Sequence, residues 1–254
     1  MGLSIFNDFM SIRVVTVSLK KALDLFFPRN CIHCGDAADT SSYDFICKLC
    51  AKDLIECVEP ACCTCGYPFY GEIMLAKKCP HCAELDPAFD RGKTLFIAKG
   101  IGRSLLHELK YRRGMYILND LARIARRSRH YLEYIRNAIL VPVPLHPVRL
   151  RERGFNQSEH IAKMLVNCTG STARVDKLLI RNQYTQSQTN LNRAARSQNV
   201  KNAFALASNT VLNPDEQYII VDDVFTTGST LNACAKVLRR GGANRIKVAT
   251  MGHG

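Results

Sequence analysis

The chain has 254 residues, of which 47% are hydrophobic and 22% are charged. This composition is that of a folded globular protein and excludes a chain that is mainly disordered. No run of about 18 apolar residues is present, so we expect no membrane span. Residues 3–27 carry charges inside and after their apolar part, unlike a secretory signal, which predicts a cytoplasmic protein.

Charge and cysteine are both distributed unevenly along the chain. Residues 1–90 carry 8 Lys and Arg against 12 Asp and Glu, a net charge of −4, whereas residues 91–254 carry 27 against 10, a net charge of +17. Ten of the 12 cysteines lie between Cys31 and Cys82. Such asymmetry predicts separate modules. We expect an N-terminal helix in residues 1–30, a cysteine-rich module in residues 31–90 and a basic domain in residues 91–254.

The first predicted element is a helix over residues 10–27. Its apolar side chains recur every three or four residues from Ile12 to Leu23, and Pro28 would end it. The polar face of this helix is only mildly basic, which favours packing on a neighbouring part of the protein over lying on a membrane surface.

Two sets of four cysteines follow, each made of two Cys-x-x-Cys pairs. Twelve residues separate the pairs of the first set and thirteen separate those of the second. In a reducing cytosol this spacing is typical of zinc sites in which four thiolates complete the coordination shell, so the zinc would be structural. A segment of about 60 residues buries little core, and metal binding would supply folding free energy. The predicted ligands are Cys31, Cys34, Cys47, Cys50, Cys62, Cys65, Cys79 and Cys82.

Other residues near these sets have less direct interpretations. Cys63 could replace Cys62 as a ligand, although only Cys62 has the Cys-x-x-Cys spacing. Cys57 has no partner in the pattern and is expected to be a buried apolar residue. We expect His33 and His81 to be bystanders, because four sulfurs already complete each shell. Each centre would carry a formal charge of −2, so this module is expected to be a framework or a protein-docking surface, not a grip for phosphates.

The basic excess of the second half is concentrated in residues 99–153, which hold 13 Lys and Arg against four acidic residues. Two interpretations fit this segment: helices with solvated basic faces, or a binding site for an anion such as nucleic acid or a phosphorylated metabolite. Four tyrosines lie among the arginines and could either stack on bases or pack in helix cores. They are Tyr111, Tyr116, Tyr131 and Tyr134.

The segment with the most specific chemistry begins with a short apolar strand, Tyr218–Val221. Two carboxylates, Asp222 and Asp223, follow where we expect the strand to end. A loop rich in hydroxyl groups then leads into a helix that would stop at Gly241-Gly242, and a further strand is expected over residues 245–250. Backbone N–H groups at such a helix start, next to a glycine, form a cradle for phosphate. The loop residues are Val224, Phe225, Thr226, Thr227, Gly228, Ser229 and Thr230.

This cradle is neither a Walker A loop nor a dinucleotide-binding loop, because Gly-x-x-x-x-Gly-Lys-Ser/Thr and Gly-x-Gly-x-x-Gly are both absent. Adjacent carboxylates before a phosphate cradle suit a phosphorylated sugar. They can accept hydrogen bonds from neighbouring sugar hydroxyls while the loop holds the attached phosphate. The simpler alternative is a pair of acidic residues at a strand end, before a Thr-rich helix cap.

A second polar cluster follows a strand predicted over residues 138–143. Pro142 and Pro144 stiffen the turn after this strand, and a helix is expected from Glu159 to Val166. The arginines of the cluster could meet a pyrophosphate, which needs several positive charges and forked donors, or could be surface charges. The candidate pyrophosphate-side residues here are Pro144, Leu145, Arg149, Arg151 and Arg153.

The loop from Asp222 to Thr230 resembles the phosphoribosyl pyrophosphate (PRPP) signature of type I phosphoribosyltransferases. From Phe26 to Met251 the chain is similar to the ComF family of competence-associated, phosphoribosyltransferase-like proteins. The residues that carry this second resemblance are Phe27-Pro28, the cysteine pairs with Gly66-Tyr67-Pro68, Pro87-Ala88-Phe89-Asp90, Leu109-Lys110-Tyr111-Arg112, Pro142-Val143-Pro144, Arg153 to Ser158, Arg181, Thr185, Gln188, Arg196, Asn199, Phe204 and the PRPP loop.

The resemblance implies an α/β fold: a type I phosphoribosyltransferase-like parallel sheet flanked by helices, preceded by an N-terminal helix and a small double zinc-ribbon module. It implies that Asp222 and Asp223 hold the ribose hydroxyls of PRPP, that the loop wraps the 5′-phosphate, and that magnesium accompanies the pyrophosphate. Lys110 would lie on the pyrophosphate side, and residues 99–116 would form a hood. Such a reaction depends on positioning and charge stabilisation, so no general base is required.

Three functions are compatible with these features. The favoured one is a cytosolic PRPP-binding protein of natural competence, which holds transforming single-stranded DNA on its basic half and other DNA-uptake proteins through its zinc ribbons. The second is an active phosphoribosyltransferase in nucleotide salvage or cofactor metabolism. The third is a PRPP-responsive regulator without chemistry.

Overall fold

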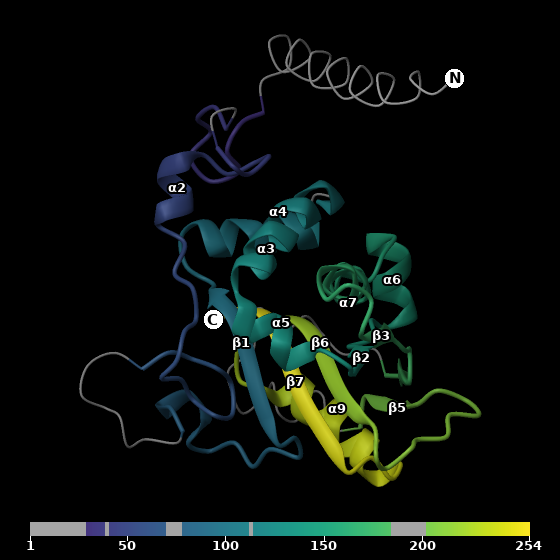
Figure 1. Cartoon of the computed structure of the whole chain (residues 1–254). Coiled ribbons are helices and arrows are strands. Elements are labelled where there is room, and N and C mark those ends of the chain that lie inside the picture. Colours follow the sequence, from purple (N-terminus) through teal and green to yellow (C-terminus); the bar gives the residue numbers. More distant parts are fainter. Residues whose placement is uncertain (1–28, 39–40, 70–77, 112–113, 184–201) are drawn as a thin grey trace, which may run out of the picture.

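The computed structural model describes residues 29–38, 41–69, 78–111, 114–183 and 202–254 (Figure 1). The helix predicted over residues 10–27 lies outside the described residues, and so do the motif residues between 184 and 201. Within the described ranges, no helix combines the length and the apolarity that crossing a bilayer requires.

A five-stranded sheet in the order β1-β7-β6-β2-β3 forms the centre of the molecule, and all of its strand pairs are parallel. The strands β2 and β6 are apolar on both faces, as expected where helices cover both sides of a parallel sheet. This arrangement confirms the predicted α/β fold. The strands are β1 Arg91–Ile97, β2 Ile139–Pro142, β3 Arg174–Val175, β6 Gln217–Phe225 and β7 Arg245–His253.

Helices cover the sheet on both faces and divide the core in two (Figure 1). One core lies under α3, α4, α5 and α7, and the other lies under α9 and a two-stranded sheet of β4 and β5. These elements are α3 Ile101–Tyr111, α4 Leu118–Arg127, α5 Arg129–Ile135, α6 Pro147–Arg153, α7 Gln157–Cys168, β4 Leu179–Arg181, β5 Phe204–Leu206 and α9 Ser229–Arg240. One-turn 3-10 helices occupy Pro80–Cys82 and Met115–Ile117.

The elements predicted within the described residues are present, but several ends differ. The strand predicted over residues 218–221 continues to Phe225, so Asp222 and Asp223 lie within β6 and not beyond it. The segment that carries the alternating arginines is a helix, α6, which was not predicted. Helix α7 begins at Gln157, where the Asn156 side chain accepts the Ser158 N–H and caps it. The cap explains why the helix starts before the apolar residues do.

The two cysteine sets pack against different cores. The first ribbon, residues 29–54, contains the short helix α2 (Lys48–Lys52) and joins the core under α3 and α4. Asp120, in the first turn of α4, accepts the backbone N–H groups of Asp44 and Phe45, both at 2.7 Å. The second ribbon, which comprises the described parts of residues 55–90, joins the core under α9. The ribbons therefore sit on opposite faces of the same sheet.

The start of the second ribbon covers the free edge of the sheet at β1. The Ile97 N–H donates to the Ile55 carbonyl at 2.9 Å, and the Cys57 N–H donates to the Leu95 carbonyl at 2.9 Å. A covered edge strand cannot pair with another chain, so this contact also protects the sheet. Cys57 is only 4% exposed, which confirms the expectation that it is a buried apolar residue.

Candidate functional site

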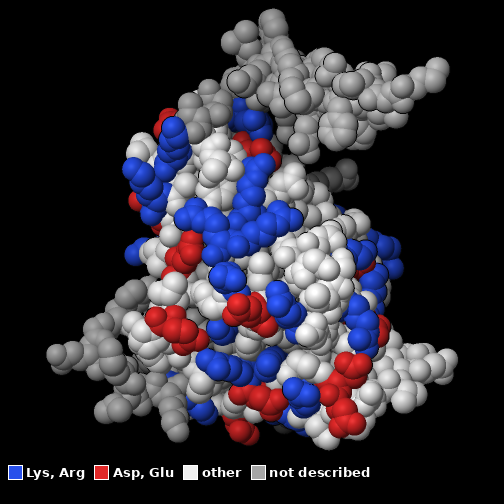
Figure 2. Space-filling view, in the orientation of Figure 1, with Lys and Arg blue, Asp and Glu red and all other residues white. Residues whose placement is uncertain are grey.

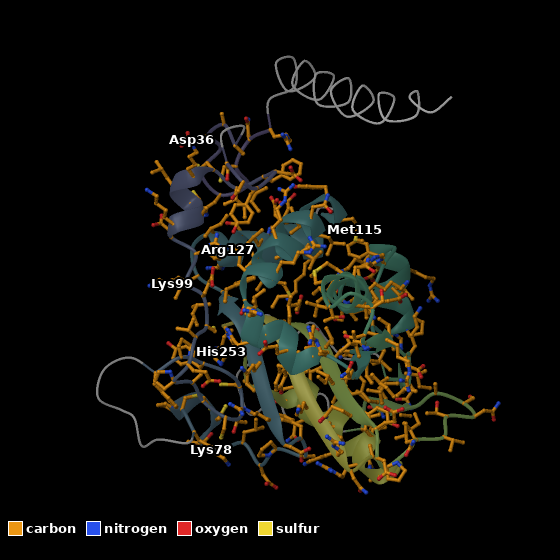
Figure 3. All side chains as sticks on the ribbon, viewed as in Figure 1. Asp36, Lys78, Lys99, Met115, Arg127 and His253 are labelled. Atoms are coloured by element: carbon orange, nitrogen blue, oxygen red, sulfur yellow. The ribbon has the colours of Figure 1, made fainter. Side chains whose placement is uncertain are left out.

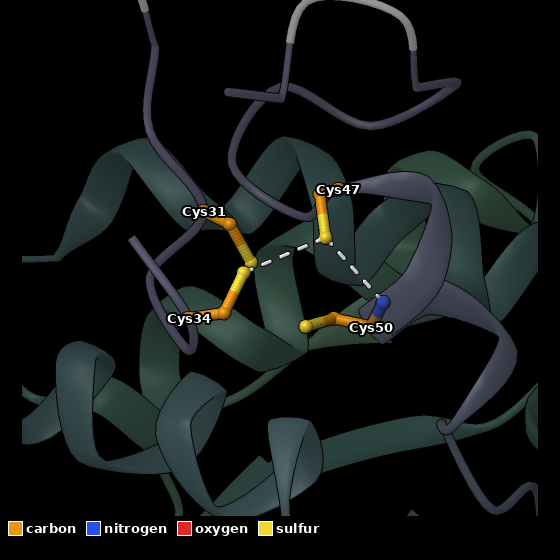
Figure 4. A group of neighbouring side chains, drawn as sticks. All are labelled: Cys31, Cys34, Cys47 and Cys50. Carbon is orange, nitrogen blue, oxygen red and sulfur yellow. Dashed lines mark hydrogen bonds between the residues drawn. The ribbon is translucent and has the colours of Figure 1, made fainter. Parts of the chain in front are cut away.

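The first cysteine set converges on a common point (Figure 4). The four sulfurs of Cys31, Cys34, Cys47 and Cys50 lie within 4.8 Å of one another, and those of Cys34 and Cys47 are 3.6 Å apart. Sulfurs at the corners of a tetrahedral zinc site, with Zn–S bonds of about 2.3 Å, are about 3.8 Å apart. The Cys50 N–H also donates to Cys47 Sγ at 3.4 Å. This first tetrad therefore fits a structural zinc ion.

The second cysteine set forms a more deeply buried tetrad. Its four sulfurs also lie within 4.8 Å of one another, and each residue is at most 1% exposed. Cys65 Sγ lies 3.6 Å from Cys79 Sγ, and the Cys79 N–H donates to Cys62 Sγ at 3.2 Å. Cys63 is only half-buried and stands outside the tetrad. The four cysteines predicted as ligands are therefore brought together, and Cys62, not Cys63, belongs to the tetrad.

The sulfurs of the second tetrad also interact with one another. The hydrogen bond with Cys65, followed by those with Cys79 and Cys82, lowers the pKa of Cys62, while the bond with Cys62 raises the pKa of Cys65. A divalent cation would replace the thiol protons, because thiolates and not thiols bind metal. His33 is engaged elsewhere, with Nδ1 2.9 Å from Ser104 Oγ on α3. This contact agrees with its expected role as a bystander.

The two predicted carboxylates are consecutive residues near the carboxyl end of β6. Ser158 Oγ donates to Asp222 Oδ1 at 2.8 Å, and Lys110 Nζ lies 2.9 Å from Asp223 Oδ2. Burial, followed by the negative charge of Asp223, raises the pKa of Asp222 to about 7, against the lowering effects of Ser158 and Lys110. Three elements far apart in the sequence, α3, α7 and β6, therefore meet at this carboxylate pair.

The phosphate loop, Thr226–Thr230, follows β6 directly and leads into α9. Gly228 turns the backbone with a φ of 73°, in the left-handed region that favours glycine. Thr227 Oγ1 accepts the Ser229 N–H at 3.3 Å, which caps the start of the helix. Free N–H groups and the positive end of the helix dipole meet at such a start. By contrast, Phe225 is 1% exposed, so its side chain belongs to the core and not to the wall of the cradle.

The predicted pyrophosphate side is only partly brought together. Because α6 is helical, Arg149 and Arg153 share one face, while Arg151 projects from the opposite side and is exposed. Arg153 Nη1 donates to Gln157 Oε1 at 2.6 Å, and Arg149 pairs with Glu152 at 3.1 Å. Pro144 and Leu145 are half-buried in the turn before α6. The geometry thus distinguishes Arg151 from the other two arginines.

Two residues beyond the predicted site set lie close to the carboxylates. Ser158 binds Asp222 directly, as described above. Arg181, at the end of β4, stands 5.3 Å above the Phe204 ring; burial lowers its pKa, and the negative charge of Asp222 opposes that effect. Both residues belong to the motifs that carry the ComF resemblance. Their place in those motifs is therefore the signal by which the sequence could have identified them as site residues.

The tyrosines of the basic segment mostly pack. Tyr131 is fully buried and donates to the Thr250 carbonyl at 3.0 Å. Tyr134 donates to the Arg91 carbonyl at 2.8 Å, and burial raises the pKa of its hydroxyl. Tyr116 donates to Glu108 and lies edge-to-face against Phe45, with ring centroids 4.5 Å apart. The packing interpretation is therefore confirmed for Tyr131. Tyr116 is 40% exposed, and the side chain of Tyr111 lies outside what the structure describes.

Models of known protein families match the same two parts of the chain. A family model described as a phosphoribosyl transferase domain matches residues 112–252, and one described as a double zinc ribbon domain matches residues 22–85. Sheet, loop and tetrads together define a protein with a phosphoribosyltransferase-type domain and a double zinc ribbon. Among solved structures, a hypoxanthine phosphoribosyltransferase from Staphylococcus aureus aligns with 52% of this chain and 62% of its own, at 13% identity and a TM-score of 0.33.

Curated relatives cover most of the chain. Competence protein F of Haemophilus influenzae is 31% identical over 232 residues, which are 88% of this chain and 96% of that protein. DNA utilization protein YhgH of Salmonella typhimurium is 32% identical over 210 residues, 80% of this chain and 88% of that protein. Competence protein ComFC of Streptococcus pneumoniae is 30% identical over 111 residues, 44% and 46% of the two chains. The chain belongs to the ComF family.

Proposed function

We propose that the chain binds PRPP at the carboxyl end of β6. The observation that carries this proposal is the juxtaposition of Asp222 and Asp223 with the phosphate loop. A sugar whose hydroxyls donate to the two carboxylates would have its 5′-phosphate within reach of the loop N–H groups. Phosphoribosyl compounds carry two neighbouring hydroxyls and a 5′-phosphate on one sugar, which is the pattern that this arrangement would bind.

The positive side chains around the carboxylates suit the pyrophosphate of PRPP. Lys110 approaches from α3, and Arg149 and Arg153 share one face of α6. Arg181 adds a charge that acts on Asp222. A pyrophosphate needs several such charges, and magnesium bound with it would supply more when present. In this proposal Arg151 contributes least, because it projects away from the other arginines.

The names of the relatives place them in competence and DNA utilization, and we propose that this chain acts there too, in the cytoplasm, on transforming single-stranded DNA. Figure 2 shows Lys and Arg side chains gathered on the upper part of one face; in Figure 3, Lys99 and Arg127 are labelled in that region. In this proposal the ribbons dock other DNA-uptake proteins.

The DNA proposal is tested by the salt dependence of single-strand binding. Fluorescence anisotropy with a labelled oligonucleotide should show affinity falling by at least tenfold between about 50 and about 200 mM salt, because phosphate contacts release counterions. Binding that is absent, or that is insensitive to salt, would exclude the basic face as a DNA surface.

The PRPP proposal is tested by calorimetric titration with PRPP and magnesium. The double variant Asp222→Ala with Asp223→Ala should lose PRPP binding, whereas Asp215→Ala, an exposed carboxylate before β6, should bind as the wild type does. Retained affinity in the double variant would reject the site.

A second candidate is an active phosphoribosyltransferase, favoured by the match of the domain to that family model. It is distinguished by incubating the chain with PRPP, magnesium and a panel of nucleobases and measuring pyrophosphate release. Release with one base identifies an enzyme and its acceptor. Binding without release with any base favours a PRPP-responsive regulator, whose partner binding should then depend on PRPP.

A further inference from the structure

The second ribbon contacts the phosphate loop through the first turn of α9. Asn232 uses both ends of its side-chain amide: Nδ2 donates to the Asp86 carbonyl and Oδ1 accepts the Ala88 N–H, both at 2.8 Å. The backbone N–H of Asn232 donates to the Gly228 carbonyl at 2.8 Å, which closes the first turn of the helix. One side chain therefore ties the end of the phosphate loop to residues 86–88 of the ribbon.

A second contact lies under the turn of the loop itself. A methyl group added at Gly228 would lie 2.6 Å from Phe225 Cζ and 2.9 Å from Leu85 Cδ2. The backbone at Gly228 is thus packed directly on these two side chains. The Leu85 N–H donates to the Cys82 carbonyl at 3.1 Å. The contact with the loop therefore comes from a residue three positions beyond a ligand of the second tetrad.

A third contact comes from the other pair of cysteines in the same tetrad. Tyr67, two residues after Cys65, lies edge-to-face against His253, with ring centroids 4.8 Å apart. His253 stacks in turn on Phe225, with centroids 5.4 Å apart and an interplanar angle of 16°. Figure 3 labels His253 beside the second ribbon. Both halves of the tetrad are therefore connected to the residues that carry the loop.

We propose that the second ribbon positions the phosphate loop, so that the loop binds its anion with full affinity only while the second tetrad holds its metal. This inference rests on the PRPP site proposed above. A cradle of backbone N–H groups binds phosphate well only if the groups are already aimed at it, because ordering a loose loop on binding costs free energy. The metal fixes Cys65 and Cys82, and these residues lead directly to Tyr67 and Leu85.

The first ribbon provides the internal contrast. It hydrogen-bonds to α3 and α4, through Ser104 and Asp120, on the opposite face of the sheet. Both tetrads have the same four-thiolate chemistry. We therefore expect the two metals to differ in function: the second supports the loop, and the first supports the helices of the other core.

The test keeps both tetrads intact and removes the contacts between ribbon and loop. Asn232→Ala and Leu85→Ala are compared with Asn167→Ala, an exposed asparagine of α7. Zinc per chain is measured together with the dissociation constant for PRPP and magnesium. Each of the two loop variants should retain two zinc ions and bind PRPP about tenfold more weakly, because the two hydrogen bonds of the Asn232 amide or the packed Leu85 side chain are lost. The control should bind as the wild type does.

Amide hydrogen exchange tests the same inference without PRPP. Exchange over residues 225–232 should be faster in Asn232→Ala and in chain treated with a zinc chelator, while exchange over Ile139–Pro142 stays slow. If the wild type does not bind PRPP, the proposed function is rejected. Faster loop exchange in Asn232→Ala would still support positioning of the loop by the ribbon. The inference is overturned if exchange in the loop is the same in Asn232→Ala as in the wild type. It is also overturned if the wild type binds PRPP and both loop variants bind it with the same affinity as the wild type.

Discussion

Lys110 Nζ lies 2.9 Å from Asp223 Oδ2 and joins the last turn of α3 to the carboxylate pair of β6. The carboxylate is 4% exposed and the lysine side chain 25% exposed, so water screens this ion pair less than an ordinary surface pair. In the proposed site Lys110 faces Asp223 on one side and the pyrophosphate on the other. The pair therefore connects the ribose-binding and pyrophosphate-binding parts of the site.

Replacement of Lys110 by methionine should separate these two parts. We expect Lys110→Met to weaken PRPP binding by about tenfold or more, because a charge that pairs with pyrophosphate is lost. Binding of ribose 5-phosphate, which has no pyrophosphate, should change by less than about threefold. The measurement is calorimetric titration with both ligands, with Lys163→Met as the control, since Lys163 is 58% exposed on α7. An equal loss for both ligands would assign Lys110 to the ribose side alone.

Much of the fold could be predicted because its signals are local. The buried strand before Asp222, the loop and the glycines after α9 appear within a few residues of one another, and their order fixes a strand–loop–helix unit. Strand β1 was not predicted. Its neighbours on the sheet are β7, more than 150 residues away, and the ribbon segment at Ile55 and Cys57. No local pattern encodes such pairing.

The site could be predicted less completely than the fold, because some of its residues come from elements that are distant in the sequence. Asp222, Asp223 and the loop are contiguous, so the sequence identified them together. Ser158 reaches Asp222 from α7, and Arg181 at the end of β4 interacts electrostatically with Asp222; only the tertiary structure brings them there. Arg151 was grouped with Arg149 and Arg153, two residues away on either side, because a pyrophosphate needs several positive charges. Once α6 forms, the same spacing places it on the opposite face.

The raised pKa of Asp222 should make stability depend on pH. The folded-state pKa is about 7, above the usual carboxyl value of about 4, so between these values the folded protein holds a proton that the unfolded chain has lost. The contribution to stability is full below about pH 4 and is lost as the pH rises through 7. Relative to Asp222→Asn, whose side chain stays neutral, the wild type should lose about 1–2 kcal/mol of unfolding free energy between about pH 6 and 8. Urea unfolding at each pH with constant zinc measures it, and parallel pH profiles would contradict it.

Zinc content should distinguish the two adjacent cysteines of the second ribbon. The chain should hold two zinc ions, and Cys63→Ser should keep both, because Cys63 lies outside the tetrad. Cys62→Ser should lose one, because a buried tetrad with three thiolates binds zinc more weakly. Metal analysis after gel filtration measures the ratio. Loss of zinc from Cys63→Ser with two ions retained in Cys62→Ser would reverse the ligand assignment.

Asp120 should be among the most stabilising polar residues of the first ribbon interface. It is fully buried, and its two oxygens accept the N–H groups of Asp44 and Phe45 at 2.7 Å, with Arg123 at 3.0 Å from Oδ1. Asp120→Ala leaves these donors without an acceptor, which should lower the free energy of unfolding by about 2–4 kcal/mol. Asn119→Ala, exposed on the same helix, should change it by less than about 0.5 kcal/mol. Urea unfolding at constant zinc gives both values, and a small effect of Asp120→Ala would mean that water replaces the carboxylate and that the ribbon does not depend on this anchor.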